Sequence, residues 1–230
     1  MTAGSVPVLT IDGPSGSGKG TISRRVATRL GWALLDSGAL YRLVAVGAQR
    51  AGLEPTDVPA HAAFAHRMAV RFGAHPDGSE RIELDGADVT AAVRSETAGN
   101  GASRVAAWEP VRSALLQRQR DFARPPGLVA DGRDMGTVVF PAAALKIFLT
   151  ASATERALRR YNQLKDKGSG VSLAALSREI AERDERDTRR ALAPLRPADD
   201  AIVVDSTSLD IDQVVGRVLE LARERGFEPK

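Results

Sequence analysis

The chain of 230 residues contains no cysteine and few histidines. Without cysteine, a disulfide framework, a thiolate nucleophile and a cysteine-ligated metal site are all excluded. The histidines, His61, His66 and His75, fall in one segment outside every motif described below, and we expect them to be structural or exposed. Histidine-based catalysis is therefore disfavoured.

Aromatic residues, long apolar runs and excess charge are scarce as well. Aromatics make up 4% of the residues, which disfavours a stacking platform for single-stranded nucleic acid. No apolar run approaches the roughly 18 residues of a membrane span, and the N-terminal stretch lacks the basic start of a signal peptide. The net charge of +3 suits a small anionic substrate as well as a polyanion. We therefore expect a cytoplasmic monomer with no membrane or nucleic-acid partner, although nucleic-acid binding stays open as an alternative.

Apolar runs and helical patterns alternate along the chain in the order of an α/β fold. A helix with apolar residues at helical spacing over 19–31 follows the apolar run at 6–12, and a second helix expected over 38–52 follows the run at 32–36, which gives a strand–helix–strand–helix order. This order favours a parallel sheet with right-handed crossovers. The expected core strands are residues 6–12, 32–36, 126–132, 144–151 and 201–206.

Other segments break this pattern. Three short strand-like runs separated by turn residues, at 70–74, 81–86 and 88–90, predict a small antiparallel insert near residues 65–92. An arginine-rich helical segment lies near residues 155–195 and contains a glycine–serine turn at 167–170. The other expected helices are 57–69, 93–107, 109–124, 153–166, 172–191 and 209–226.

The stretch GPSGSGKGT lies between the first expected strand and its helix. A phosphate-binding loop needs a preceding strand, glycines whose N–H groups can point inward, a helix N-terminus and a lysine that reaches the terminal phosphates. All four are present, so an ordinary surface turn is a much weaker interpretation. We expect this loop to bind ATP through Gly13, Pro14, Ser15, Gly16, Ser17, Gly18, Lys19, Gly20 and Thr21.

The residue after Lys19 is Gly20, where GTPases and motor ATPases carry a hydroxyl that holds Mg²⁺. Here the hydroxyl is displaced to Thr21, and the pattern G-x-x-G-x-G-K-G-T resembles the nucleoside monophosphate kinases. A regulatory GTPase also needs a guanine-specificity motif. The nearest string, NQLKD at 162–166, has the wrong spacing and lies on an expected helix. A nucleotide-gated switch protein is therefore the weaker alternative.

Further polar residues lie where other expected strands end. The string LLDSGALYR places Ser37, Tyr41 and Arg42 after the second strand, at the carboxyl edge where α/β proteins bind ligands. Any one of them alone would be compatible with an ordinary turn or a weak surface ion pair. Arginine suits a planar phosphate clamp, so this edge favours a second, phosphate-bearing substrate.

The string DGRDMGTVVFP repeats this arrangement. A strand ends at Asp131, and Arg133 and Asp134 follow in the turn. A carboxylate at such a position is suited to hold the water shell of Mg²⁺, which commonly keeps several waters. We therefore expect Asp131 to contribute to the metal site.

These strings, together with NGASRVAAWEPVR at 100–112 and RDERDTRRALAPLRP at 183–197, closely resemble bacterial cytidylate kinases. The resemblance covers essentially the whole chain, including the β insert that shorter kinases of the class lack. It implies an α/β fold with a five-stranded parallel P-loop kinase core, helices on both faces, a small α/β insert and an arginine-rich helical lid. The implied domains are a core of residues 1–36, 125–154 and 192–230, a monophosphate-binding domain of 37–124 and a lid of 155–191.

The resemblance also implies the reaction and its residues. The reaction is phosphoryl transfer from ATP, with Mg²⁺, to CMP and dCMP; a kinase that prefers UMP or AMP is the nearest alternative. The implied cytosine contacts are Ser37, Ser103, Arg112 and Asp134. Contacts to the phosphates are implied for Arg42, Arg133 and Arg190, and contacts to the sugar hydroxyls for Arg183 and Asp187. Tyr41 is assigned to the substrate site, and the implied catalytic residues are Lys19, Arg133, Arg183 and Arg190.

Charged residues also cluster on the two expected lid helices. On the second helix, one face carries Arg183, Arg186, Asp187 and Arg190. The preceding helix carries a second set, Arg156, Arg159 and Arg160. Alternating charges on a helix usually indicate a solvated, salt-bridged surface. The resemblance instead implies a lid that brings arginines to the transferred phosphoryl group, without distinguishing which arginine contacts it.

Overall fold

The structure is a computed structural model that describes residues 6–165 and 172–228. The chain divides into two compact units, one formed by Met1–Asp36 with Gln119–Lys230 and the other by Ser37–Arg118. The second unit is thus an insertion into the first along the chain. The functional division into core, monophosphate-binding domain and lid stays a prediction.

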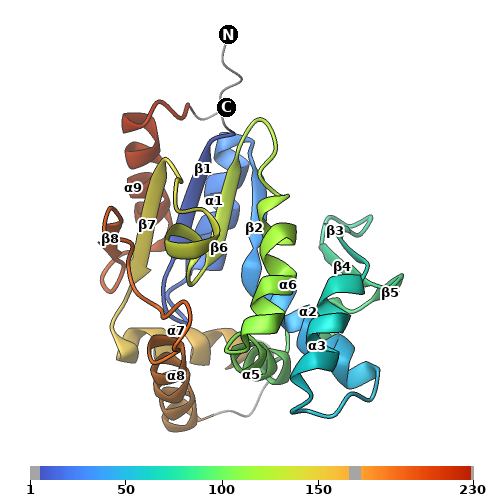
Figure 1. The fold of residues 1–230 in the computed structure, drawn as a ribbon. Coiled ribbons are helices and arrows are strands. Elements are labelled where there is room, and N and C mark those ends of the chain that lie inside the picture. The colour runs from blue at the N-terminus through green and yellow to red at the C-terminus, as the bar shows by residue number, and fades with distance from the viewer. Residues whose placement is uncertain (1–5, 166–171, 229–230) are drawn as a thin grey trace. The chain divides into compact units, whose positions relative to one another are not determined.

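A parallel sheet organises the first unit (Figure 1). Its strands are β1 (Val8–Asp12), β2 (Ala33–Asp36), β6 (Leu128–Gly132), β7 (Leu145–Thr150) and β8 (Ile202–Asp205). They form one 5-stranded sheet in the order β2-β6-β1-β7-β8, and every neighbouring pair is parallel. β1 and β6 are buried along their whole length, as their continuous apolar runs predicted. The expected α/β class and sheet are confirmed.

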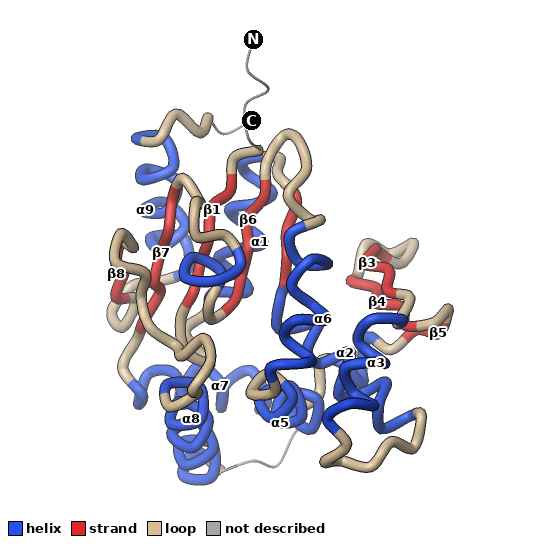
Figure 2. The backbone as a smooth tube through the Cα atoms, viewed as in Figure 1, coloured by secondary structure: helices blue, strands red, loops and turns tan. Residues whose placement is uncertain are grey.

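α1 and α9 cover one face of this sheet and the short η1 lies against the other, while α7 and α8 lie beyond the ends of the strands (Figure 2). Their bounds are α1 Lys19–Leu30, η1 Met135–Val139, α7 Ala153–Lys165, α8 Leu173–Thr188 and α9 Ile211–Glu224. Side chains alternate along a strand, and Leu9 and Ile11 of β1 share one buried cluster with α1 and α9. Thr10 therefore faces the other side, where Gly136 of η1 lies against its hydroxyl.

The second unit consists of helices and a 3-stranded antiparallel sheet in the order β3-β4-β5. Its strands are β3 (Val70–Ala74), β4 (Glu80–Leu84) and β5 (Ala87–Asp88). Its helices are α2 (Ser37–Arg50), α3 (Val58–Arg67), α4 (Thr90–Val93), α5 (Glu96–Val105) and α6 (Glu109–Arg120), the last of which continues into the first unit. The antiparallel strands expected from the turn-rich sequence are confirmed.

The helix expected at 93–107 is present as α5, but its expected start is three residues too early. α4 ends at Val93 and α5 begins at Glu96, after a break at Arg94 and Ser95. Ser95 takes an extended conformation and its hydroxyl accepts a hydrogen bond from the N–H of Ala98, which makes it the N-cap of α5.

Other expected boundaries differ as well. The strand expected at 88–90 ends at Asp88, because the Asp88 carboxylate accepts from the N–H and the hydroxyl of Thr90 and thereby begins α4. α8 ends at Thr188 rather than at residue 191. The expected turn at 167–170 lies outside the described residues. Among the described helices, none has the length and apolar character that crossing a membrane requires.

Candidate active site

The loop between β1 and α1 takes a conformation that only glycine accommodates well. Gly13, Gly16 and Gly18 have φ angles of 155°, 78° and 88°. A Cβ atom on Gly13 would lie 2.0 Å from the carbonyl oxygen of Leu149. The loop is therefore packed directly against the end of β7, and its N–H groups are held in place before any ligand arrives.

Replacing Gly13 by alanine is expected to lower the free energy of unfolding by about 2–3 kcal/mol, because a Cβ cannot fit beside Leu149. Chemical denaturation measures this change. The matched control is Gly216→Ala in α9, where an added Cβ meets nothing within 4 Å. That variant should be neutral or slightly stabilising, because alanine favours a helix. Equal effects of the two substitutions would contradict the packing argument.

Lys19 begins α1 and is only 7% exposed. Its Nζ donates a hydrogen bond of 2.9 Å to the carbonyl oxygen of Pro14, within the same loop. Burial, together with the charges of Arg133 and Arg183, lowers the pKa of Lys19 to about 7, although Asp131 and Asp187 act in the opposite direction. An anion beside the ammonium group favours its charged form, so bound phosphates would raise this pKa.

The carboxylate of Asp131 lies beside the first turn of α1. Its Oδ2 is 3.4 Å from the position of a Cβ on Gly20, and the side chain is buried at the end of β6. Gly20 is followed by Thr21, whose side chain is exposed in the same turn. An oxygen donor at this place fits Mg²⁺ held through phosphates and waters. In the described part of the chain, no three His, Cys, Asp or Glu side chains are grouped as a metal site.

Asp12, at the end of β1, is a site residue that the sequence reasoning missed. It is buried, and its two carboxylate oxygens accept hydrogen bonds from the N–H groups of Met135 and Gly136, at 2.9 and 2.8 Å. Burial raises the pKa of Asp12 to about 7, although the two hydrogen bonds from these N–H groups act to lower it. The negative charges of Asp134 and Asp131 add to the increase. Asp12 thus fastens the start of η1 to β1. A charged residue ending an apolar strand was the only signal in the sequence.

η1 was not expected from the sequence, and it determines where the DGRDMG string lies. It is a single π-helical turn in which the N–H of Phe140 donates to the carbonyl oxygen of Met135 at 2.7 Å. Asp134 immediately precedes this turn and is buried. Arg133 comes one residue earlier, at the end of β6. The hydrogen bonds that the N–H groups of Met135 and Gly136 donate to Asp12 therefore help to set the positions of Arg133 and Asp134.

Asp187 on α8 joins two of the predicted arginines. Its Oδ2 is 3.1 Å from Nε of Arg133, and its Oδ1 is 3.3 Å from Nη2 of Arg190. Burial acts to raise the pKa of Asp187, but the charges of Arg133, Arg190 and Arg183 outweigh it, so the pKa is lowered. The structure thus brings Arg133, Arg183 and Arg190 together around Asp187. The charges of Arg133, Arg183 and Asp187 also act on Lys19.

The expectation that these charges share one helical face needs correction. Arg190 lies beyond the end of α8, and Arg186 is exposed while Asp187 is buried. On the solvated side of α8, Glu185 forms an exposed ion pair of 2.7 Å with Arg189, the residue that caps the helix. α8 therefore has one buried side, whose Asp187 pairs with predicted substrate residues, and one solvent-exposed side with a surface ion pair.

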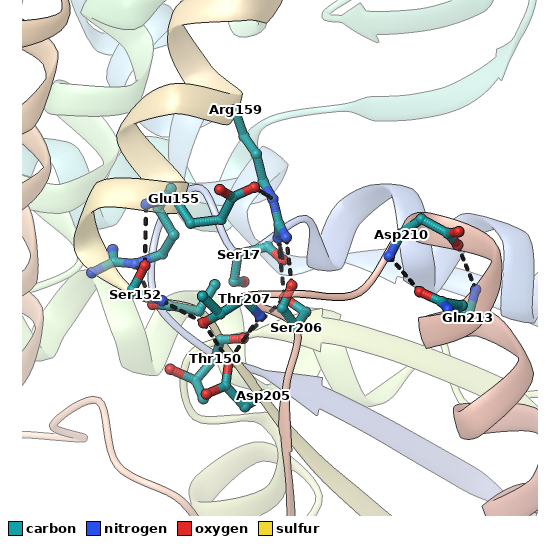
Figure 3. A network of polar contacts seen from close by, with 12 residues as sticks. Ser17, Thr150, Ser152, Glu155, Arg159, Asp205, Ser206, Thr207, Asp210 and Gln213 are labelled. Carbon is teal, nitrogen blue, oxygen red and sulfur yellow. Dashed lines mark hydrogen bonds and ion pairs between the residues drawn. The ribbon is translucent and has the colours of Figure 1, made fainter.

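Two arginines of α7, Arg156 and Arg159, face the phosphate loop and its neighbours. Arg160 instead donates to Oε1 of Gln163 on the same helix at 3.1 Å. Arg159 donates to the hydroxyl of Ser206 at 3.0 Å and to its carbonyl oxygen at 2.5 Å, and its Nε pairs with Glu155 (Figure 3). Arg156 donates to the carbonyl oxygen of Ser15 at 2.9 Å. Both guanidinium groups are thus engaged with backbone oxygens. That one of the lid arginines contacts the transferred phosphoryl group stays a prediction, which does not specify the residue.

The remaining predicted substrate residues lie in the second unit. Ser37 begins α2 and Tyr41 follows one turn later, both buried. Arg42 donates to the carbonyl oxygens of Val93 and Ser95 at 2.9 and 2.8 Å. The break between α4 and α5, which the sequence did not predict, thus supplies the acceptors that orient Arg42.

α5 packs closely against α2 within this unit, because a Cβ on Gly101 would lie 2.8 Å from that of Ala45. Ser103 is buried on α5. Arg112 on α6 donates to the carbonyl oxygen of Ala106 at 3.3 Å. The predicted residues of this unit are therefore carried by helices that pack together.

The histidines are structural or exposed, as expected. His61 is buried and contacts Trp108 edge-on with ring centroids 5.1 Å apart, while its Nδ1 lies 2.7 Å from the carbonyl oxygen of Asp57. His66 is exposed, and His75 lies 3.3 Å from the Asp88 carboxylate.

Comparisons with known proteins agree with this geometry. A family model described as cytidylate kinase matches residues 9–224. The cytidylate kinase of Stutzerimonas stutzeri (strain A1501) is 61% identical over 221 residues, covering 96% of each chain. The cytidylate kinase of Pseudomonas aeruginosa (strain LESB58) is 58% identical over 227 residues, covering 98% of this chain and 99% of that protein.

Solved structures resemble the chain less closely. A shikimate kinase from Bacteroides thetaiotaomicron is 12% identical with a TM-score of 0.46, and covers 95% of this chain and 99% of its own. A gluconokinase from Sinorhizobium meliloti 1021 is 16% identical with a TM-score of 0.47, and covers 96% of this chain and 94% of its own. These scores are too low to bear on function, whereas the sequence matches extend over nearly the whole chain. The chain belongs to the cytidylate kinase family.

Proposed function

We propose that the protein transfers the terminal phosphoryl group of ATP to CMP and dCMP, giving ADP with CDP or dCDP. Full-length identity of about 60% to curated cytidylate kinases is the observation that carries this proposal. A UMP or AMP kinase is not favoured by this family membership. A nucleotide-gated switch is disfavoured too, because it has no use for the arginines that follow the strand ends.

The phosphate loop is proposed to bind ATP. N–H groups around Gly13, Gly16 and Gly18 and the N-terminus of α1 would surround the phosphates. Lys19, once an anion restores its full charge, would neutralise the terminal phosphates. Mg²⁺, when bound, neutralises further charge on the phosphate oxygens. Asp131 would hold its water ligands from the carboxylate position beside α1 described above.

The acceptor needs no general base. A phosphate monoester has a second ionisation near pH ~6, so the phosphate of CMP is already a dianion at neutral pH. Catalysis then consists of positioning the two phosphates and neutralising charge on the transferred group. This agrees with the placement of His61, His66 and His75 outside the candidate site.

The acceptor phosphate is proposed to meet Arg42 and Arg133, and Arg190 is proposed to act near the phosphates. The carbonyl oxygens of Val93 and Ser95 orient the guanidinium of Arg42, and arginine is well suited to bind a phosphate dianion. Arg133 is fixed by Asp187, so substrate binding has to exchange part of this ion pair for phosphate contacts. Arg183 and Asp187 are proposed to reach the sugar hydroxyls.

The base is proposed to meet Ser37, Ser103, Arg112 and Asp134, with Tyr41 completing the substrate site. Cytosine presents an exocyclic amino donor and two acceptors, and therefore needs hydroxyl, guanidinium and carboxylate partners together. In this proposal residues 37–124 bind the monophosphate and residues 155–191 act as a lid that excludes water. A monomeric state and a cytoplasmic location remain predictions.

The test is ADP release from ATP with AMP, GMP, CMP, UMP, dCMP and shikimate offered in turn. CMP and dCMP are expected to be the best acceptors, because only cytosine offers an amino donor next to two acceptors in a pyrimidine ring. Equal rates with AMP and CMP would rule the proposal out. ATP turnover that is the same with and without any acceptor would favour the switch alternative.

A further inference from the structure

One buried arginine connects three segments around the phosphate loop. Arg156, at the start of α7, is 5% exposed. Its Nε donates to the carbonyl oxygen of Ala151 at 3.0 Å, its Nη1 to that of Ser15 at 2.9 Å, and its Nη2 to Oδ2 of Asp184 at 2.5 Å. The end of β7, the phosphate loop and α8 therefore meet at a single guanidinium group.

The loop and α7 are also packed backbone to backbone at this point. A Cβ on Gly16 would lie 3.1 Å from both the Cβ and the carbonyl oxygen of Arg156. Arg156 therefore cannot shift without moving the loop. Its guanidinium is a fixed point, held by two carbonyl oxygens that remain whatever α8 does.

Asp184 is the residue of α8 that reaches this fixed point. It directly follows Arg183 and lies one helical turn before Asp187. Asp187 makes the other ion pairs of this side of α8, with Arg133 and Arg190. All of these partners are proposed substrate residues, so those pairs have to change when substrate binds. The Arg156–Asp184 pair uses no proposed substrate residue and can persist.

We infer that the Arg156–Asp184 ion pair anchors α8 to the phosphate loop and thereby positions Arg183 and Asp187 for the transfer. The inference rests on the proposed function. Arg156 and Asp184 are positioning residues, because they act through the α8 side chains and not on the substrate. The anchor would fix the α8 charges relative to ATP bound at the phosphate loop, and in-line transfer requires such a fixed relative position.

Asp184→Asn tests the anchor. The substitution removes the charge from α8 but leaves the two carbonyl contacts of Arg156 with the rest of its surroundings intact. We expect kcat with CMP to fall by about 10- to 100-fold, because α8 then holds its charges less precisely. The KM for CMP should rise, while the dissociation constant for ADP, measured by calorimetry without CMP, should stay unchanged.

The matched control is Glu185→Gln on the neighbouring position of the same helix. It breaks the exposed pair with Arg189, in which the side chains are 57% and 79% exposed, and should leave kcat unchanged. Asp184→Glu keeps the charge and should restore turnover close to the wild-type value. Thermal unfolding of each variant shows whether it is folded. If Asp184→Asn does not fold, Arg156→Lys is compared with Asp184→Glu instead. Lysine keeps the positive charge of Arg156 but lacks the several N–H donors of its guanidinium group.

Three outcomes would overturn the anchor: Asp184→Asn turning over CMP as fast as Glu185→Gln, loss of ADP affinity in parallel with kcat, or glutamate failing to restore turnover. If Asp184→Asn does not fold, Arg156→Lys turning over CMP as fast as Asp184→Glu would count equally against the anchor. Failure of the proposed function looks different, because the wild-type protein would then be inactive with CMP. A loss measured against an active wild type therefore concerns the anchor alone.

Discussion

Lys19→Ala is expected to reduce turnover with every acceptor by about 10³-fold, the scale of removing a preorganised charge from a transition-state site. Lys19 is the cation inside the loop itself, and its Nζ is held over the loop by the carbonyl oxygen of Pro14. A steady-state assay of ADP release at saturating ATP and CMP measures the effect. A loss confined to one acceptor would contradict a role on the shared donor phosphates.

The control for this prediction is the stability of the variant, because unfolding would also reduce activity. The pKa of Lys19 predicts that the substitution does not destabilise the protein. The folded-state pKa of Lys19 is lowered from 10.5 to about 7, so between these values the unfolded chain binds more protons at this group. The contribution of Lys19 to stability therefore rises as pH increases from 7 towards 10.5 and is unfavourable at neutral pH. Lys19→Ala should accordingly unfold no earlier than the wild type at pH 7, in the absence of nucleotide.

Asp134→Ala is expected to raise the KM for CMP by about 10- to 100-fold, which corresponds to losing one hydrogen bond to a charged group. Asp134 is 3% exposed and directly precedes η1, whose first N–H groups are held by Asp12. The backbone around it is thus fixed independently of its own side chain. The KM for ATP should not change.

UMP provides the control for this second prediction. Uracil carries a carbonyl oxygen where cytosine carries its amino group, so a carboxylate partner favours cytosine. Removing that carboxylate should lower the ratio of CMP to UMP turnover. An unchanged KM for CMP in Asp134→Ala would show that the assignment of Asp134 to the base is wrong.

The fold was largely predictable because its signals are local. The core strands are short, continuous apolar runs, and the loop from Gly13 to Lys19 carries its glycines at a spacing that few other structures need. Parallel order then follows from the alternation of strands and helices. The sequence patterns therefore predicted most of the strands and helices of the first unit.

The parts that were missed depend on contacts between residues far apart in the chain. η1 exists because the carboxylate of Asp12 holds the N–H groups of Met135 and Gly136, more than a hundred positions away. The break at Ser95 lies where its own carbonyl oxygen and that of Val93 accept from Arg42. No local propensity encodes either interaction. The predicted roles of individual site residues remain proposals for the same reason.

The insertion of the second unit has a consequence for how the chain is made. β2 pairs only with β6, and β1 pairs with β6 and β7, so both N-terminal strands lack a partner until residues 128–150 have been synthesised. At about 5–20 residues per second, the ribosome delivers all of the inserted unit before that point. The helices and the antiparallel sheet of residues 37–118 can therefore fold first, while the apolar strand VLTID remains exposed without its partner strands. During synthesis, the inserted unit is therefore complete before the five-stranded sheet of the first unit can begin to assemble.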